Sequence, residues 1–158
     1  MHVNKVMERR SSDNKYLHKD FHISQNILMG YIYRSFGADA LINYLEQFAI
    51  AYHKPLNQKL KQGHIDALLN YFTGIYKKEE WPVKITSGED YVEIEQDACP
   101  GISHIMAKGG KPCPCYRETY HTIYKTLCKD TPFEYILKYF HDETGACKQL
   151  FLRKEGKQ

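Results

Sequence analysis

The hydrophobic pattern of this chain changes at Trp81-Pro82, and this change constrains the fold more than any other feature of the sequence. Before it, apolar residues recur every three to four positions, which is the period of an amphipathic helix. After it, apolar and polar residues alternate in short runs separated by glycine-containing turns, which is typical of half-buried strands. Helices in the first half and hairpins in the second predict an α+β protein.

The first half is predicted to form three helices. Gly37 ends the first helix and Gly63 ends the second, since glycine is common just after a helix C-terminus. Pro55 interrupts the second pattern, because proline lacks a backbone donor and clashes with the preceding turn, so we expect a kink or a break there. The predicted helices are residues 16–36, Ala38 to about Gln62, and His64 to about Glu80. The apolar residues that recur at helical spacing in the first of them, and are predicted to form its apolar stripe, are Leu17, Phe21, Leu28, Tyr31 and Ile32.

The second half is predicted to form two β-hairpins with helices between them. Residues 87–90 and 141–145 provide the two hairpin turns. Alternation places Tyr135, Leu137 and Tyr139 on one face of the third strand. We therefore expect an N-terminal three-helix cover followed by hairpin, helix and hairpin, giving a four-stranded antiparallel sheet packed against helices. The predicted elements are strands near 83–85, 91–95, 133–140 and 147–153, a short helix at 102–107, and a longer helix from Tyr116 to about Lys129.

The length and charge of the chain limit its organisation and its partners. Its 158 residues fit one α+β domain, predicted at residues 14–158 after a flexible tail at residues 1–13. The net charge is +3 and both signs are interspersed, which argues against a nucleic-acid partner. No apolar run approaches the roughly 18–20 residues of a membrane span, and no signal peptide is evident. We expect a cytoplasmic protein whose partner is a small-molecule ligand or substrate, and a homodimer is left open.

All five cysteines lie between residues 99 and 147. An odd number without a secretory signal favours thiols, metal ligands or catalytic groups over a disulfide framework. Cys113 and Cys115 are separated by one residue and have no second pair, so a zinc-ribbon or treble-clef module is not expected, and no compact iron–sulfur spacing is present. We expect instead a discontinuous site, in which Cys115 at a helix start meets Cys99 and Cys147 at strand ends.

The cysteines are not equivalent in this prediction. A thiol near a helix N-terminus has a lowered pKa, which favours metal binding or nucleophilic attack, so Cys115 and Cys99 are the preferred functional thiols. Cys113 is the second choice beside Cys115. Cys128, inside a predicted helix, is expected to be an apolar packing residue, and small buried thiols are the alternative for the others.

Histidines and tyrosines supply the remaining candidates. His18 and His22 are four residues apart on one helix face, where they can share a metal ion, and Gln25 lies on the same face. Surface or hydrogen-bonded core histidines are the alternative. His104 follows Cys99 by five residues and is a candidate base or an exposed loop residue. Thirteen tyrosines suggest a polar cavity, because a buried ring still needs a partner for its hydroxyl, and solvent-exposed tyrosines are the alternative. The candidate ligand-binding residues are His18, Gln25, Tyr120 and Tyr139.

The predicted order of elements resembles the domain shared by L-2-amino-thiazoline-4-carboxylic acid hydrolases and 4-vinyl-reductase-type ligand-binding domains. The resemblance covers roughly Tyr16 to Lys154 and depends on short motifs: a cysteine closing the first hairpin between Glu95 and Pro100, Cys115 opening the next helix, and the turn at residues 145–151. That turn is similar to the Gly-Ala-x-x-Cys-x-Phe-Arg run that ends the hydrolases. In the ligand-binding branch, the resemblance implies a zinc ion held by Cys115, Cys147 and a carboxylate.

Two functional hypotheses follow. The first is a hydrolase acting on a small cyclic C=N or amide-type compound, with Cys115 or Cys99 as nucleophile and His22 or His104 as acid and base, since imidazole titrates near neutrality. The second is a non-enzymatic domain, a sensor or carrier, that binds a small molecule or a metal. Cys99, Cys115, Cys147 and His22 are the predicted metal ligands, and zinc or iron is the expected metal.

Overall fold

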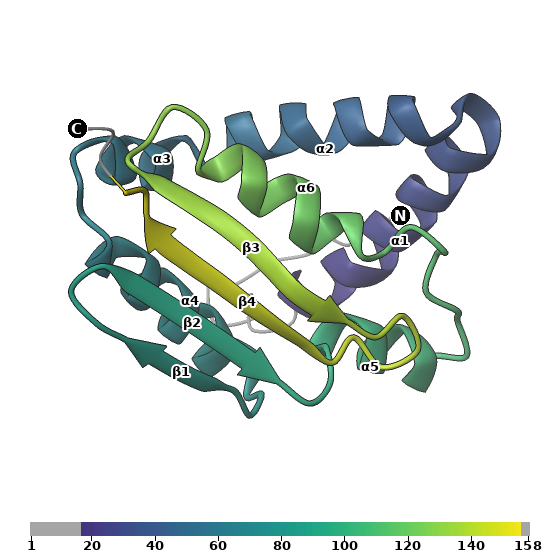
Figure 1. The fold of residues 1–158 in the computed structure, drawn as a ribbon. Coiled ribbons are helices and arrows are strands. Elements are labelled where there is room, and N and C mark those ends of the chain that lie inside the picture. The colour runs from purple at the N-terminus through teal and green to yellow at the C-terminus, as the bar shows by residue number, and fades with distance from the viewer. Residues whose placement is uncertain (1–16, 156–158) are drawn as a thin grey trace, which may run out of the picture.

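The computed structural model describes the backbone of residues 17–155 and the side chains of residues 21–155, and it confirms the predicted α+β fold. The helices lie behind one face of a four-stranded antiparallel sheet (Figure 1). The predicted tail at residues 1–13 lies outside the described residues. The elements are α1 (Leu17–Phe36), α2 (Ala38–Tyr52), α3 (Lys54–Lys61), α4 (Asp66–Glu79), β1 (Lys84–Ser87), β2 (Tyr91–Gln96), α5 (Pro100–Ala107), α6 (Glu118–Leu127), β3 (Phe133–Phe140) and β4 (Cys147–Arg153).

The predicted second helix is divided in two at His53, which confirms the expected break near Pro55. Pro55 lies in the first turn of α3, where its missing N–H has no intrahelical partner to lose. Gly37, with φ of 89°, separates α1 from α2 in a conformation that other residues adopt at a cost. The two sharp changes of direction let α1, α2 and α4 surround a common space.

Helix α1 buries a different face from the one predicted. Asn26 is buried, and its amide donates to the carbonyl of Lys111 at 2.8 Å while its oxygen accepts from the N–H of Cys113 at 2.8 Å. These bonds satisfy two backbone groups of the loop before α6 and turn the Gln25 and Met29 side of the helix inward. The predicted apolar stripe is therefore exposed, at 42% for Phe21, 40% for Leu28 and 54% for Tyr31.

The sheet has the strand order β1-β2-β4-β3, and every neighbouring pair is antiparallel. Its inner face carries Val92, Ile94 and Phe151, which pack against Leu68 and Phe72 of α4 in one buried cluster. Removing this apolar surface from water is the main favourable contribution to folding. Helices α4 and α6 therefore lie directly on the sheet, and α1 and α2 pack outside them.

A β-bulge in β3 overturns one prediction about the sheet. Leu137 pairs with Gln149 and Tyr139 pairs with Lys148, so two residues of β3 oppose one residue of β4 and the alternation shifts by one position. Tyr139 therefore points to the outer face with Lys148, at 39% exposure, whereas it was predicted to share the face of Tyr135. Its hydroxyl donates to Glu95 at 3.5 Å on that face.

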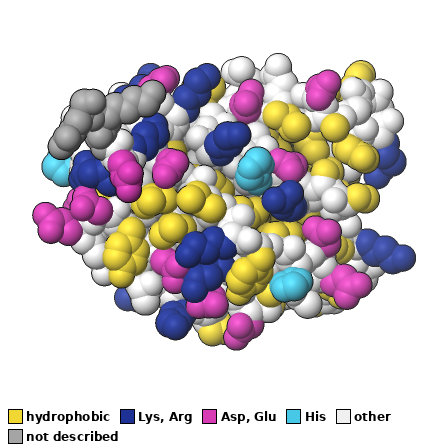
Figure 2. Space-filling view, viewed as in Figure 1, with side chains coloured by type: hydrophobic (Ala, Val, Ile, Leu, Met, Phe, Trp, Pro, Cys, Tyr) yellow, Lys and Arg dark blue, Asp and Glu magenta, His cyan; other side chains and the backbone are white. Residues whose placement is uncertain are grey.

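The outer face of the sheet carries charges of both signs (Figure 2). Glu93 accepts contacts from Lys138 at 3.1 Å and Lys148 at 2.9 Å, and Lys148 also lies 3.5 Å from Glu95. Opposite charges that face each other across neighbouring strands support the pairing register. Between residues 17 and 155, no helix is long and apolar enough to cross a membrane.

Candidate functional site

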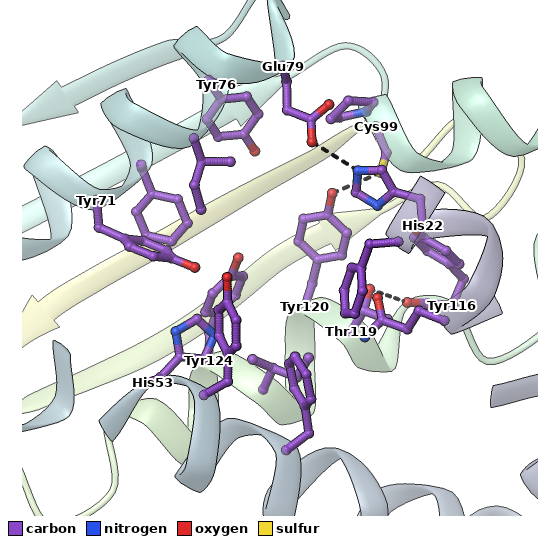
Figure 3. Close-up of a pocket in the computed structure, with 18 residues that line it drawn as sticks. His22, His53, Tyr71, Tyr76, Glu79, Cys99, Tyr116, Thr119, Tyr120 and Tyr124 are labelled. Atoms are coloured by element: carbon purple, nitrogen blue, oxygen red, sulfur yellow. Dashed lines mark hydrogen bonds and ion pairs between the residues drawn. The ribbon is translucent and has the colours of Figure 1, made fainter. Parts of the chain in front are cut away.

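A cavity of about 320 Å³ lies among the helices (Figure 3). Its wall is mostly aromatic, and among the described residues that line it there is no lysine or arginine. The lining residues come from α1, α2, α4, α6 and the start of α5, with no residue from a strand: Phe21, His22, Gln25, Phe48, Tyr52, His53, Tyr71, Phe72, Ile75, Tyr76, Glu79, Cys99, Pro100, Tyr116, Thr119, Tyr120, Ile123 and Tyr124.

One end of the cavity holds an imidazole–carboxylate pair. His22 Nε2 lies 3.0 Å from Glu79 Oε1, and the two side chains are 14% and 2% exposed. A buried carboxylate is costly unless it is paired, and Glu79 also sits in the last turn of α4, where the helix dipole disfavours negative charge. Helix structure therefore does not account for Glu79 at this position, whereas pairing with His22 does.

The first turn of α5 lies directly against this pair. Gly101 is buried there, and a Cβ added to it would be 2.7 Å from His22 Nδ1 and closer still to the hydroxyl of Tyr116. The absence of a side chain at Gly101 thus lets the backbone of α5 approach both groups. His22 Nδ1 and the Tyr116 hydroxyl therefore both lie beside Gly101 at the cavity wall.

Cys99 is the N-cap of α5, and its sulfur is an acceptor in this site. It accepts hydrogen bonds from the N–H of Ile102 at 3.5 Å and from the hydroxyl of Tyr120 at 3.0 Å. Burial raises the pKa of the Cys99 thiol, and these donors offset only part of that effect. The thiol is therefore neutral at neutral pH, and the helix N-terminus does not make it a ready thiolate.

A directed chain of hydrogen bonds connects Cys99 to the sheet. Tyr76 donates to Gln96 Oε1 at 2.5 Å, and Gln96 Nε2 donates to the hydroxyl of Tyr120 at 3.2 Å and to the carbonyl of Gly145 at 3.0 Å. Tyr120 then donates to Cys99. Burial raises the pKa of Tyr76 and Tyr120 well above their usual value, so both hydroxyls keep their protons and remain donors.

The other end of the cavity holds a second imidazole in a different setting. His53 is 5% exposed, and its ring contacts Tyr71 and Tyr124 with centroids 5.5 and 6.2 Å apart. Burial lowers the pKa of His53 to about 4, so the ring is neutral at neutral pH. This end is aromatic and uncharged, whereas the His22 end contains a carboxylate.

The predicted catalytic and ligand-binding residues are divided among several places. His22, Cys99, Gln25 and Tyr120 line the cavity together, whereas Tyr139 lies on the outer face of the sheet. His104 lies outside the cavity lining, and its Nε2 is buried without a hydrogen-bond partner among the described residues. The side chain of His18 lies outside the described residues.

The three cysteines predicted to meet do so only in part. Cys147 pairs with Gln96 across the sheet, and the N–H of Cys99 donates to the carbonyl of Thr144 at 2.8 Å, which brings Cys99 and Cys147 to the same end of the sheet. Gly145, with φ of 70°, lies so close to Cys99 that a Cβ would overlap the Cys99 side chain. Cys115 lies elsewhere, beside Cys113.

The described residues do not fit the predicted metal site. Among residues 21–155, no group of three or more His, Cys, Asp or Glu side chains is arranged to hold a metal ion. Cys99, Cys115, Cys147 and His22 do not form such a group, and neither do Cys115 and Cys147 with a carboxylate.

Several lining residues were not found from the sequence. Glu79 belongs to the charged run 77–80, which is typical of a solvent-exposed helix end, and it is 57 residues from His22. His53 lies between Tyr52 and Lys54 at a helix start, and this local sequence gives no sign that it is buried. The high tyrosine content was the one available signal, since Tyr52, Tyr71, Tyr76, Tyr116 and Tyr124 all line the cavity with Tyr120.

No protein-family model matches this chain, and neither the curated proteins nor the solved structures provide a match. The resemblance to the thiazoline hydrolases and vinyl-reductase-type domains therefore stays a prediction from short motifs.

Proposed function

We propose that this chain binds a small, mostly aromatic molecule with one neutral polar group in the helix-lined cavity. The observation that carries the proposal is the cavity itself, with the His22–Glu79 pair at one end of an aromatic wall. Its volume of about 320 Å³ lies at the lower end of the range for small-molecule sites, which combine apolar walls with a few polar groups. The five free thiols favour a reducing compartment, so a cytoplasmic location is part of the proposal.

The charges at the cavity select the polar group of the ligand. Glu79 lies beside His22, and no lysine or arginine lines the described wall. A second carboxylate buried against this described wall would meet no lysine or arginine, and a buried carboxylate without a cation is costly. An amide, hydroxyl or ring nitrogen can instead use the Tyr116 hydroxyl and the His22 ring, which meet at Gly101. The ligand class is therefore a neutral amide or nitrogen heterocycle.

A hydrolase acting on a cyclic C=N or amide-type compound is the second candidate. The observation that favours it is the carboxylate-oriented imidazole, because an imidazole held by a carboxylate is suited to taking a proton from water or a thiol. Cys99 lines the same cavity, but its raised pKa means that it would have to lose its proton to a base before attacking. Water activated by His22 is the simpler route.

One experiment tests both candidates with naphthalene-2-carboxamide as the probe. Calorimetric titration should show that the probe binds the wild-type chain. Binding to Ile75→Trp should be at least tenfold weaker, because the larger side chain fills part of the cavity. Binding to the control Ile136→Trp, at an exposed strand position, should be unchanged. Equal affinity in all three proteins would refute the cavity as the site. Chromatography of the same mixture detects naphthoate, the product of amide hydrolysis. Naphthoate that the wild-type chain releases and His22→Gln does not would favour the hydrolase over the binding domain.

A further inference from the structure

Cys113 and Cys115 form a pair of thiols outside the cavity lining. Their Sγ atoms are 3.1 Å apart, and both side chains are partly exposed. A disulfide has an S–S distance of about 2.0 Å, so a shift of roughly 1 Å would bring the two sulfurs to bonding distance. Cys99, Cys128 and Cys147 are fully buried by comparison, so this is the thiol pair in the described chain that a reagent from solution can reach.

The loop that carries the pair is held against α1. Asn26 accepts from the N–H of Cys113 and donates to the carbonyl of Lys111, both at 2.8 Å. The Cys113 side chain lies over Gly30, where a Cβ would be 3.8 Å from Cys113 Cβ and 3.0 Å from the guanidinium of Arg34. Pro114 between the cysteines restricts the backbone further. The sulfurs are therefore held next to each other, with a cation nearby.

The two thiols differ in their surroundings. Both contact the buried cluster that includes Met29 of α1 and Ile123 of α6, and burial, followed by the neighbouring Cys115 thiol, raises the pKa of Cys113 to about 12. Cys115 lines a surface hollow together with Tyr33, Arg117, Glu118 and Asp142. A molecule arriving from solution meets Cys115 first, and Cys113 is positioned behind it.

We propose that Cys113 and Cys115 are a dithiol–disulfide exchange site for small disulfides such as oxidised glutathione. The Cys115 thiolate attacks one sulfur of the glutathione disulfide, whose S–S bond breaks and releases one glutathione, which takes up a proton. Cys113 then loses its proton and attacks Cys115 Sγ, which releases the second glutathione. The two cysteines lose two electrons and two protons, and the glutathione disulfide gains them.

Peptide mapping tests this site directly on the full chain. Reduced protein is incubated with oxidised glutathione, quenched with acid, alkylated with iodoacetamide in denaturant and digested with trypsin. Because trypsin does not cleave before proline, residues 109–117 form one peptide that contains Cys113, Cys115 and no other cysteine. In the oxidised protein this peptide should carry no alkyl group and should be two hydrogens lighter than its dithiol form. Cys99, Cys128 and Cys147, each in a separate peptide, should all be alkylated.

Two matched variants identify the order of attack. Cys113→Ser should keep one glutathione on Cys115, because no second thiol can release it, and Cys115→Ser should react at least tenfold more slowly. Cys128→Ser is the control and should behave as wild type. The proposal is overturned if peptide 109–117 of the wild type stays fully alkylated, if it retains glutathione without closing, or if the disulfide forms with a cysteine outside this peptide.

Discussion

The cavity has two ends that each contain a histidine in a different environment. His22 lies 3.0 Å from the buried carboxylate of Glu79, whereas His53 is surrounded by the rings of Tyr52, Tyr71 and Tyr124. Burial alone disfavours an imidazolium, and His53 shows this effect, with its pKa lowered to about 4. His22 has a carboxylate as its neighbour instead. The same residue type therefore makes one end polar and leaves the other neutral.

The largest expected effect comes from separating the pair at the polar end. His22→Leu leaves the Glu79 carboxylate buried without its imidazole and should lower the free energy of unfolding by ~3–5 kcal/mol at pH 7. The double variant His22→Leu/Glu79→Leu removes both polar groups and should be more stable than His22→Leu alone. Urea denaturation measures both. A double variant less stable than His22→Leu would mean that the pair is not the reason for Glu79 at this position.

Acid should destabilise the protein through His53, at the aromatic end of the cavity. The unfolded chain protonates His53 below about pH 6.5, whereas the folded chain does so only near its pKa of about 4. The unfolded state therefore binds more protons in this window, and stability falls by up to ~3 kcal/mol as the pH decreases through it. His53→Phe should lose less stability than wild type between pH 7 and 4.5. Equal losses in urea denaturation would contradict a buried neutral His53.

A smaller effect is expected from Gly101, the glycine through which α5 contacts the polar end of the cavity. Gly101→Ala places a Cβ against His22 and Tyr116 and should destabilise by ~1–3 kcal/mol, in spite of the better helix propensity of alanine. Gly74→Ala in α4 is the matched control, because nothing lies within 4 Å of its added Cβ, and it should stabilise by up to ~1 kcal/mol. Thermal unfolding should therefore shift in opposite directions, and a stabilised Gly101→Ala would refute the close contact.

Local signals in the sequence were sufficient for the elements of this fold. Gly37, Pro55 and the turn residues of both hairpins act on the backbone over only a few positions, by ending a helix or forming a turn. The structure has a break or a turn at each of them. The buried face of α1 could not be predicted from such local signals. It is set by Asn26, whose partners lie 85 and 87 residues away, and the exposed position of Tyr139 depends on a bulge that alternation does not predict.

Residues of the candidate site were predictable only where the side chain itself has a distinctive chemistry. His22 and Cys99 were chosen for their chemistry, and both line the cavity. Glu79 and His53 could not be chosen, because their role depends on burial and on partners brought together by the packing of α1, α2 and α4. Cys115 was assigned to the wrong neighbours for the same reason, since its nearest sulfur is Cys113 and not Cys99 or Cys147.

The comparison of amide and carboxylate probes tests the central claim most directly. In calorimetric titrations at pH 7, naphthalene-2-carboxamide should bind the wild-type chain at least tenfold more tightly than naphthalene-2-carboxylate, a difference of ~1.4 kcal/mol or more. The reason is that Glu79 is buried at the cavity and no lysine or arginine lines the described wall. In Glu79→Gln, which removes the negative charge, this gap should narrow. Tighter binding of the carboxylate to wild type, or a gap unchanged in Glu79→Gln, would contradict a neutral-ligand site organised by the His22–Glu79 pair.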